Sequence, residues 1–439
     1  MRIYLNRMSS TILLLALFAA DPLTLADAVQ RAVSSHPTAA SARAALRAAA
    51  EKSSLAAASR KPRIDFQESW VNSNNPVFVF SSLLTQRQFG PANFAIPTLN
   101  SPGFLNNFQS LITAEQLLFD SGRTRKSIEA ASLERQLAES SLEQVELALA
   151  ARTARAYLDA QLTRAAIPVA EQALLSARSS LIQAEASLAA GRTTPADPLS
   201  VKVQIATLEE QLLERRAQSA IASRVLHELI GAADEAAFDL STPLSASPSH
   251  PTAALLRPEL AQARLTLASS AKQTEIARLA WLPTVGLRLG FEADRQRFVT
   301  RAGSNWLAAL SLKWTPYSGG ADRALLRIAQ ASRDAAQASL TATERRLKLE
   351  VFEAQTLLDS SRARLATSQS AIDSAQETLR ITRDRYEAGL TTITELLRAE
   401  SALNDSRLRL LIANHGLRAA QLNLAAALGS LKPGAALLQ

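Results

Sequence analysis

The chain has 439 residues, a formal net charge of +8 and no cysteine, and aromatic side chains make up only 5% of it. The lack of cysteine excludes disulfide bonds, thiolate metal sites and a cysteine nucleophile, and we expect no lipid anchor on an N-terminal cysteine. The positive charge does not indicate nucleic-acid binding, because arginine and glutamate are interleaved and no block of five or more basic residues occurs.

The first 20 residues have the pattern of a signal peptide. Arg2 and Arg7 precede an apolar run from Ile12 to Ala20. Such a run suits the hydrophobic core of a signal peptide, but it is too short to cross a bilayer as a helix. We therefore expect an exported protein without a transmembrane helix.

Glycines mark an internal two-fold repeat. Three glycine pairs are each separated by 198 residues: Gly122 and Gly320, Gly191 and Gly389, and Gly231 and Gly429. The spacing is too long for a solenoid, whose units have tens of residues. The sequence therefore predicts one repeat over 21–231, a linker over 232–257, a second repeat over 258–429 and a tail over 430–439.

Prolines near the start of each repeat have a different offset. Pro37 and Pro258, like Pro62 and Pro283, lie 221 residues apart. Helices are expected before Pro37, between Pro37 and Pro62, and between the two later prolines. The first repeat must then hold about 23 additional residues, which we assign to a loop over 81–103.

Each repeat next contains a candidate β-hairpin, at about 63–119 and 284–316. Apolar and polar residues alternate over roughly ten positions in each arm of the second hairpin, which is about the length of a transmembrane strand. All four tryptophans lie in or beside these segments, as in an interfacial girdle: Trp70, Trp281, Trp306 and Trp314. Four strands are too few to close a barrel, so the strands must be pooled, and three copies are the simplest solution.

Long helices follow, predicted over 121–190 and 319–388, with return helices over 196–230 and 393–429. Large residues recur every seven positions, and small residues occupy the interleaved seam, as at Leu358 and Ala354. This heptad pattern predicts closely packed antiparallel helical hairpins. We expect Pro168 to kink the first long helix.

Several motifs in chain order resemble the TolC-like outer-membrane efflux protein family, also called outer membrane factors. They are Leu23-Thr24-Leu25-Ala26-Asp27-Ala28-Val29, Leu282-Pro283, Tyr317-Ser318-Gly319-Gly320 and Arg385-Tyr386-Glu387-Ala388-Gly389-Leu390-Thr391-Thr392. The resemblance covers nearly the whole mature chain. It implies an α+β homotrimer: helical hairpins that form the staves of an α-barrel, and two β-hairpins per chain that contribute four strands to a twelve-stranded transmembrane β-barrel.

The resemblance also implies a location and partners. The protein would lie in the Gram-negative outer membrane, in contact with its lipid, and project into the periplasm. It would be the exit conduit of a tripartite efflux or type I secretion system, without a cofactor. A periplasmic adaptor and an inner-membrane pump or ABC exporter would be its partners, and the pump would select the cargo.

The resemblance assigns a gate to the helical tips. Asp197 and Glu395 each lie six residues after a tip glycine, and Tyr386 matches a tip tyrosine that can bond an acid across helices. Other interpretations stay open, because acids are favoured near helix N-termini and Tyr386 also fits the heptad core. Arg398 stands where the family often has a second acid, and it can instead pair with Glu395 at i,i+3.

The tip surface that meets the adaptor is expected to include Gly191, Arg192, Gly389, Leu390 and Thr391, although the glycines also suit helix termination alone. The four histidines lack ligand spacing, so no metal site is expected. No catalytic motif occurs, and an enzyme is not expected. The alternative function is a soluble periplasmic coiled-coil adaptor or scaffold, which the tryptophan-rich hairpins disfavour.

Overall fold

The computed structural model describes residues 21–233, 238–244, 257–299 and 302–438. The expected signal segment therefore lies outside the described residues. The chain divides into two compact units. We call Arg43–Ser141 with Glu259–Glu344 the sheet unit, and the remainder the helical unit.

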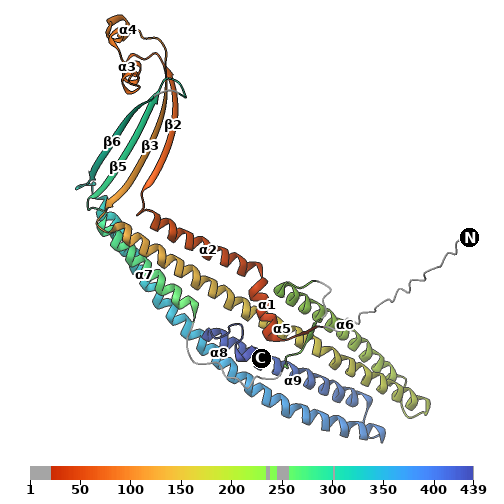
Figure 1. Ribbon diagram of the computed structural model, residues 1–439. Coiled ribbons are helices and arrows are strands. Elements are labelled where there is room, and N and C mark those ends of the chain that lie inside the picture. The colour runs from red at the N-terminus through yellow and green to blue at the C-terminus, as the bar shows by residue number, and fades with distance from the viewer. Residues whose placement is uncertain (1–20, 234–237, 245–256, 300–301, 439) are drawn as a thin grey trace, which may run out of the picture. The chain divides into compact units, whose positions relative to one another are not determined.

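The sheet unit contains one antiparallel sheet of four strands in the order β2-β3-β5-β6 (Figure 1). The strands are β2 (Arg63–Ser73), β3 (Leu105–Phe119), β5 (Thr284–Arg295) and β6 (Gly303–Lys313). The two predicted hairpins are joined in the middle, where β3 pairs with β5. This joining leaves β2 and β6 as the edges of the sheet.

The two faces of the sheet differ in polarity. Because successive side chains alternate between faces, the register determines which residues share a face. One face carries large apolar residues that are exposed in the single chain: Ile64, Phe66, Trp70, Ile112, Leu289, Trp306, Leu310 and Leu312. The opposite face is mainly polar and includes Asp65, Gln67, Ser69, Asn107, Gln109, Thr113, Glu115, Arg288, Glu292, Asp294, Asn305 and Ser311. The sheet is thus amphipathic.

The segment between β2 and β3 is helical, which corrects the expected loop over 81–103. It contains α3 (Pro76–Thr85), η1 (Pro91–Phe94) and α4 (Ile96–Asn100), which lie at one end of the sheet (Figure 1). Asn75 caps α3 by accepting a hydrogen bond from the Phe78 amide at 3.1 Å, and each helix has a proline in its first turn, where proline is tolerated. We call residues 76–104 the insert.

Helices continue from the strands: α2 (Pro37–Ala58), α5 (Arg123–Ala189), α7 (Pro258–Leu279) and α8 (Ala321–Glu387). The bounds of α5 and α8 differ by 198 residues at both ends, and each helix has 67 residues. The secondary structure of α5 continues through Pro168. Within the described residues, none of the helices has both the length and the apolar character needed to cross a bilayer.

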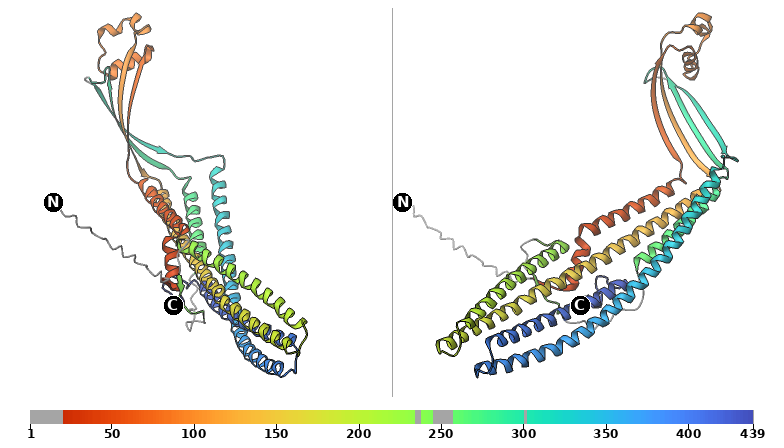
Figure 2. Two further views of the ribbon diagram at one scale, coloured as in Figure 1. Left: turned by 90° about the vertical axis from the view of Figure 1, so that its right-hand side faces the viewer. Right: turned by 180° about the vertical axis from the view of Figure 1, so that it is seen from behind.

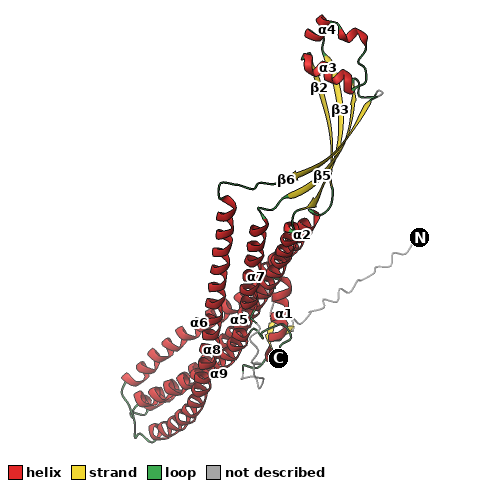
Figure 3. Cartoon of the chain, turned by 90° about the vertical axis from the view of Figure 1, so that its left-hand side faces the viewer, coloured by secondary structure: helices red, strands yellow, loops and turns green. Residues whose placement is uncertain are grey.

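In the helical unit the long helices turn back on themselves. Figure 2 shows α6 (Ala196–Ile230) beside α5 and α9 (Ile393–Leu428) beside α8, and Figure 3 shows how largely helical the chain is. The heptad positions of α8, such as Leu358 and Ala354, are buried or half-buried, as the seam pattern predicted. The hairpins therefore pack along that seam.

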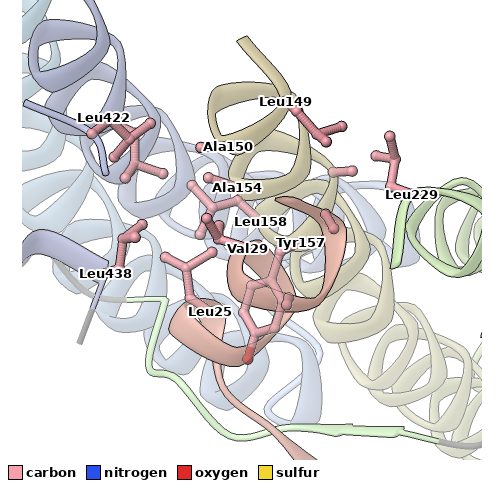
Figure 4. Packing of buried hydrophobic residues seen from close by; sticks show 14 of the residues in the cluster. Leu25, Val29, Leu149, Ala150, Ala154, Tyr157, Leu158, Leu229, Leu422 and Leu438 are labelled. Carbon is pink, nitrogen blue, oxygen red and sulfur yellow. The ribbon is translucent and has the colours of Figure 1, made fainter. Parts of the chain in front are cut away.

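A hydrophobic core gathers α1 (Leu25–Ser35), α5, α6 and α9 (Figure 4). Tyr157 is fully buried in it, donates its hydroxyl to the Leu23 carbonyl at 2.7 Å and accepts from the Thr242 amide at 3.2 Å. These contacts accompany a short parallel pairing of β1 (Asp21–Leu23) with β4 (Phe238–Leu240).

Two expected connecting segments are therefore structured. β4 lies inside the expected linker 232–257, whose residues 234–237 and 245–256 are outside the described residues. The expected tail 430–439 contributes Leu431, Leu437 and Leu438 to the core and forms a short helix, η2 (Ala436–Leu438). Hydrophobic burial against the folded neighbours orders both segments, and the linker and tail bounds stay predictions.

Substitution of Gly303 tests whether the insert packs closely on the sheet. A Cβ placed on Gly303 would lie 1.8 Å from the Thr85 carbonyl oxygen at the end of α3. We expect Gly303→Ala to displace the end of α3 and to increase cleavage of the insert by protease added to the folded protein. Gly286→Ala is the matched control, since its nearest atom, Ser311 Oγ, is 3.6 Å away. Equal resistance of both variants to cleavage would contradict this account.

Candidate functional site at the helical tips

Two turns of the same construction reverse the long helices. Gly191 and Gly389 have φ angles of 68° and 73°, in the left-handed region that favours glycine. At the second turn, the Gly389 amide donates to the Tyr386 carbonyl at 3.0 Å and the Leu390 amide donates to the Arg385 carbonyl at 2.8 Å. This pair of bonds is the Schellman motif, which satisfies the last carbonyls of a helix.

The return helix α9 begins with a polar side-chain cap, whereas the N-cap of α6 is Pro195, which makes no such hydrogen bond. Thr392 accepts a hydrogen bond from the Glu395 amide at 3.4 Å and so caps α9. At the other tip, Thr193 Oγ1 bonds the Asp197 carboxylate in the first turn of α6. Both acids thus occupy a first turn, where the helix dipole favours a negative charge.

Tyr386 and Asp197 belong to different hairpins but lie close enough for the charge of Asp197 to act on the Tyr386 hydroxyl. Burial raises the pKa of the Tyr386 hydroxyl above its ordinary value, the negative charge of Asp197 raises it further, and a hydrogen bond with Ser187 opposes the rise. Tyr386 therefore stays neutral at physiological pH. Its contacts connect the end of α8 to α5 and α6.

Glu395 does not interact with Tyr386 in the way that Asp197 does, and it pairs instead with Arg398 of its own helix. Arg398 Nη1 donates to Glu395 Oε1 at 2.7 Å, which confirms the pairing considered from the sequence. Both side chains are more than half exposed. Pairs of this kind contribute only about 0–1 kcal/mol, so this one is readily exchanged for other partners.

Glu400 is a tip residue that sequence reasoning missed. Its side chain is only 11% exposed, and Oε1 accepts from Ser180 Oγ at 2.9 Å and lies 3.5 Å from Arg383 Nη2. Glu400 thereby links its own helix α9 to α8 and to α5 of the other hairpin. It is the most enclosed acid at the tips with partners on two other helices.

The repeat offset provides a signal that would have found this contact. The positions 198 residues before Arg383 and Glu400 are Glu185 and Lys202, and these two also pair, with Lys202 Nζ 3.2 Å from Glu185 Oε1. The two hairpins therefore carry an ion pair at the same place with the charges reversed. Opposite charges at positions 198 residues apart could therefore have predicted this ion pair from the sequence.

Apolar residues fill the space beneath the tips. Val201 of α6 and Ile393 and Leu396 of α9 are buried in one cluster with Ala184 of α5 and Leu379 of α8. Leu379 lies three heptads after Leu358, and Ala184 lies four heptads after Ala156, the position 198 residues before Ala354, so both belong to the predicted pattern. The polar tip contacts thus lie on a shared apolar base.

The tryptophans lie in pairs at the two ends of the sheet. Trp70 and Trp306 are near the insert end, where Trp70 Nε1 donates to Asn106 Oδ1 at 3.2 Å. Trp281 and Trp314 are beyond the opposite strand ends, and Trp314 Nε1 donates to the Trp281 carbonyl at 3.1 Å. Both pairs are exposed in the single chain.

Two of the described histidines, His36 and His415, lie next to carboxylates, whereas His227 packs against the Phe238 ring. His415 Nε2 lies 2.7 Å from Asp159 Oδ1, and His36 Nε2 lies 3.6 Å from Glu228. Burial alone would raise the pKa of Asp159, but the bond to His415 and the charge of Arg155 hold the pKa below its ordinary value. Within the described ranges, no three of His, Cys, Asp and Glu gather as metal ligands would.

Comparison with known proteins places this geometry in a family. The model of the outer membrane efflux protein family matches residues 28–232 and 251–430. The cation efflux system protein CusC of Escherichia coli K12 is 24% identical over 321 residues, 70% of each chain. Protein CyaE of Bordetella pertussis is 28% identical over 351 residues, 76% of this chain and 73% of that protein.

Solved structures agree on the fold. A crystal structure of CusC matches with a TM-score of 0.80 at 20% identity and covers 93% of this chain and 92% of its own. The open-state MtrE outer membrane channel of Neisseria gonorrhoeae matches with a TM-score of 0.79 at 18% identity, covering 94% of this chain and 91% of its own. The chain therefore belongs to the outer membrane efflux protein family.

Proposed function

We propose that this protein is a homotrimeric conduit of the Gram-negative outer membrane that opens and closes at its helical tips. The amphipathic four-stranded sheet is the observation on which the proposal rests. Its apolar face suits lipid, its polar face suits a water-filled bore, and its two edges need strands from other chains. Three copies supply twelve strands, and the tryptophans at the strand ends suit the two membrane interfaces.

The proposed conduit is the exit of a tripartite efflux or type I secretion system. The tip turns, with Gly191, Arg192, Gly389, Leu390 and Thr391, meet a periplasmic adaptor, and an inner-membrane pump or ABC exporter delivers the cargo. Family membership and the exposed tip turns support this assignment. The chain is proposed to form two structural repeats, over 21–231 and 258–429, with one tip in each.

Removal of one hairpin tests the conduit against the coiled-coil adaptor alternative. Deletion of Pro283 to Thr315 takes away β5 and β6, so a conduit loses membrane insertion. We expect the deleted chain to be missing from purified outer membranes, while the intact chain is extracted only by detergent as an oligomer. A folded, detergent-free monomer of the deleted chain would support the adaptor instead.

Replacement of the Tyr386 hydroxyl tests the gate. Tyr386→Phe keeps the ring in its apolar cluster but removes the hydroxyl. The variant therefore loses the hydrogen bond with Ser187 and the interaction of the hydroxyl with the Asp197 charge. We expect single-channel conductance in planar bilayers to rise on the order of twofold, and Asp197→Asn to act in the same direction. Tyr317→Phe, at an exposed tyrosine of the sheet unit, should leave conductance unchanged. Unchanged conductance in the tip variants would assign these residues to packing.

Glu400 provides a separate test, because it is enclosed and joins both hairpins. Glu400→Gln keeps the size of the side chain but removes the charge that faces Arg383. We expect higher conductance together with faster proteolysis at the tips. The matched control is Glu377→Gln, because Glu377 pairs at 2.7 Å with Arg380 of its own helix and holds no second helix. Equal effects of the two substitutions would contradict a role for Glu400 in holding the tips.

A further inference from the structure

From the side chains at the insert end of the sheet, we propose a calcium-binding site. We call it the Asp294 site, and its members are Gln86 of the insert, Asn107 of β3, and Glu292 and Asp294 of β5. Asp294 is 0% exposed and Gln86 is 3% exposed. The proposal does not depend on conduction.

A chain of hydrogen bonds orients the amides. Gln86 Nε2 donates to the Asn106 carbonyl at 2.9 Å and to Asn107 Oδ1 at 2.8 Å. Asn107 Nδ2 donates to Asp294 Oδ1 at 2.7 Å. Because both hydrogens of the Gln86 amide have acceptors, the orientation of that amide is determined, and its oxygen is left for another ligand.

Two buried oxygens at this place have no donor among the described residues. Gln86 Oε1 and Asp294 Oδ2 are inaccessible to solvent, and no described group bonds either of them. Asp294 thus receives one neutral donor, although a carboxylate accepts up to about four hydrogen bonds. A buried carboxylate that is so poorly compensated requires a proton or a cation.

Further negative charge converges here. The Glu292 carboxyl is within hydrogen-bonding reach of Asp294, and its other contact is a neutral donor, Gln109 Nε2, at 2.6 Å. The C-terminal end of α3 is also close, because the Thr85 carbonyl oxygen faces Gly303, the strand partner of Asp294. Helix C-termini carry partial negative charge and favour cations.

Two nearby arginines, Arg87 and Arg295, bond other groups. Arg87 Nη2 donates to the Ser304 carbonyl at 2.9 Å. Arg295 lies on the opposite face of the sheet, where it pairs with Glu68 at 2.8 Å and bonds Ser110. Among the described residues, the hydrogen-bond partners of both carboxylates are therefore amides and each other.

The donor set identifies the class of ligand. Carboxylate and amide oxygens are hard ligands, and Ca²⁺ accepts six to eight of them in irregular geometry, whereas Mg²⁺ needs a near-octahedral arrangement. One Ca²⁺ neutralises both carboxylates and takes the Gln86 oxygen. Binding would then fasten the insert to β3 and β5.

Calcium titration of the full chain in detergent micelles tests the site. After EDTA treatment, we expect isothermal calorimetry with CaCl₂ to show one site per chain and a higher unfolding temperature with Ca²⁺ than with EDTA. Asp294→Asn should weaken binding at least tenfold, with an intact Asn107 contact, and Glu292→Gln should weaken it also. MgCl₂ should bind more weakly.

Asp65→Asn is the matched control, because Asp65 is on the same polar face, but its side chain is 45% exposed and pairs with Arg63 at 2.9 Å. Calcium held by copurified lipopolysaccharide would be equal in all variants. If the unaltered protein shows neither binding nor a temperature shift, the two acids share a proton and the proposal is wrong. Binding that Asp294→Asn leaves unchanged would also overturn it. Conductance measured on the same samples separates this outcome from failure of the conduit.

Discussion

The backbone groups along the outer edges of β2 and β6 have no neighbouring strand within the four-stranded sheet, and the rest of the proposed architecture depends on this constraint. In lipid, an unpaired amide or carbonyl costs several kcal/mol, so an open sheet with an apolar face cannot remain single in a membrane. Pairing with other copies removes the free edges and leaves the apolar face open to lipid. The proposed trimer meets both requirements: its edge strands are paired, and its apolar face contacts lipid. This explains why one chain alone exposes so many large apolar residues.

Charged residues at equivalent positions of the two hairpins are of two kinds: some have opposite signs in the two hairpins, and others are acidic in both. Glu185 and Lys202 join α5 to α6, and Arg383 and Glu400 join α8 to α9, with the signs reversed between the hairpins. At these positions the pair matters rather than the sign, because either arrangement joins two helices. Asp197 and Glu395, by contrast, are acidic in both copies and lie in first turns. A charge whose sign persists is the better candidate for interaction with a helix dipole or with the bore.

Much of the fold could be predicted from the sequence, because the periodic pattern of a long segment indicates by itself whether the segment is a helix or a strand. The heptads of α8, the alternation in β5 and the tip glycines need only local information. The insert could not be predicted: Val77 and Phe80 lie in an apolar run too short to show a period, between residues typical of loops. β4 has three residues, and the burial of Leu438 depends on a core assembled from distant helices. At the tips, the Glu395–Arg398 pair could be predicted because its residues are only three positions apart in one helix. The interaction of Tyr386 with Asp197 was expected only from the family resemblance. The role of Glu400 could not be predicted, because its partners come from other helices.

The contacts at the tips and at the insert end differ in what it takes to break them. At the tips, the Arg398–Glu395 pair is exposed, lies within α9 and contributes only about 0–1 kcal/mol, so water replaces it at small cost, whereas Glu400 is the enclosed contact between the hairpins. At the insert end, Gln86 and Asn107 are buried and hydrogen-bonded to each other, and parting them leaves polar groups unsatisfied at about 1–3 kcal/mol each. The tip turns are also anchored by glycines whose conformation costs other residues about 1–2 kcal/mol, which preserves each turn while the contacts between hairpins change. The proposed gating movement therefore suits the tips, whose turns stay intact while surface partners are exchanged, and the insert end suits the fixed part of its own unit.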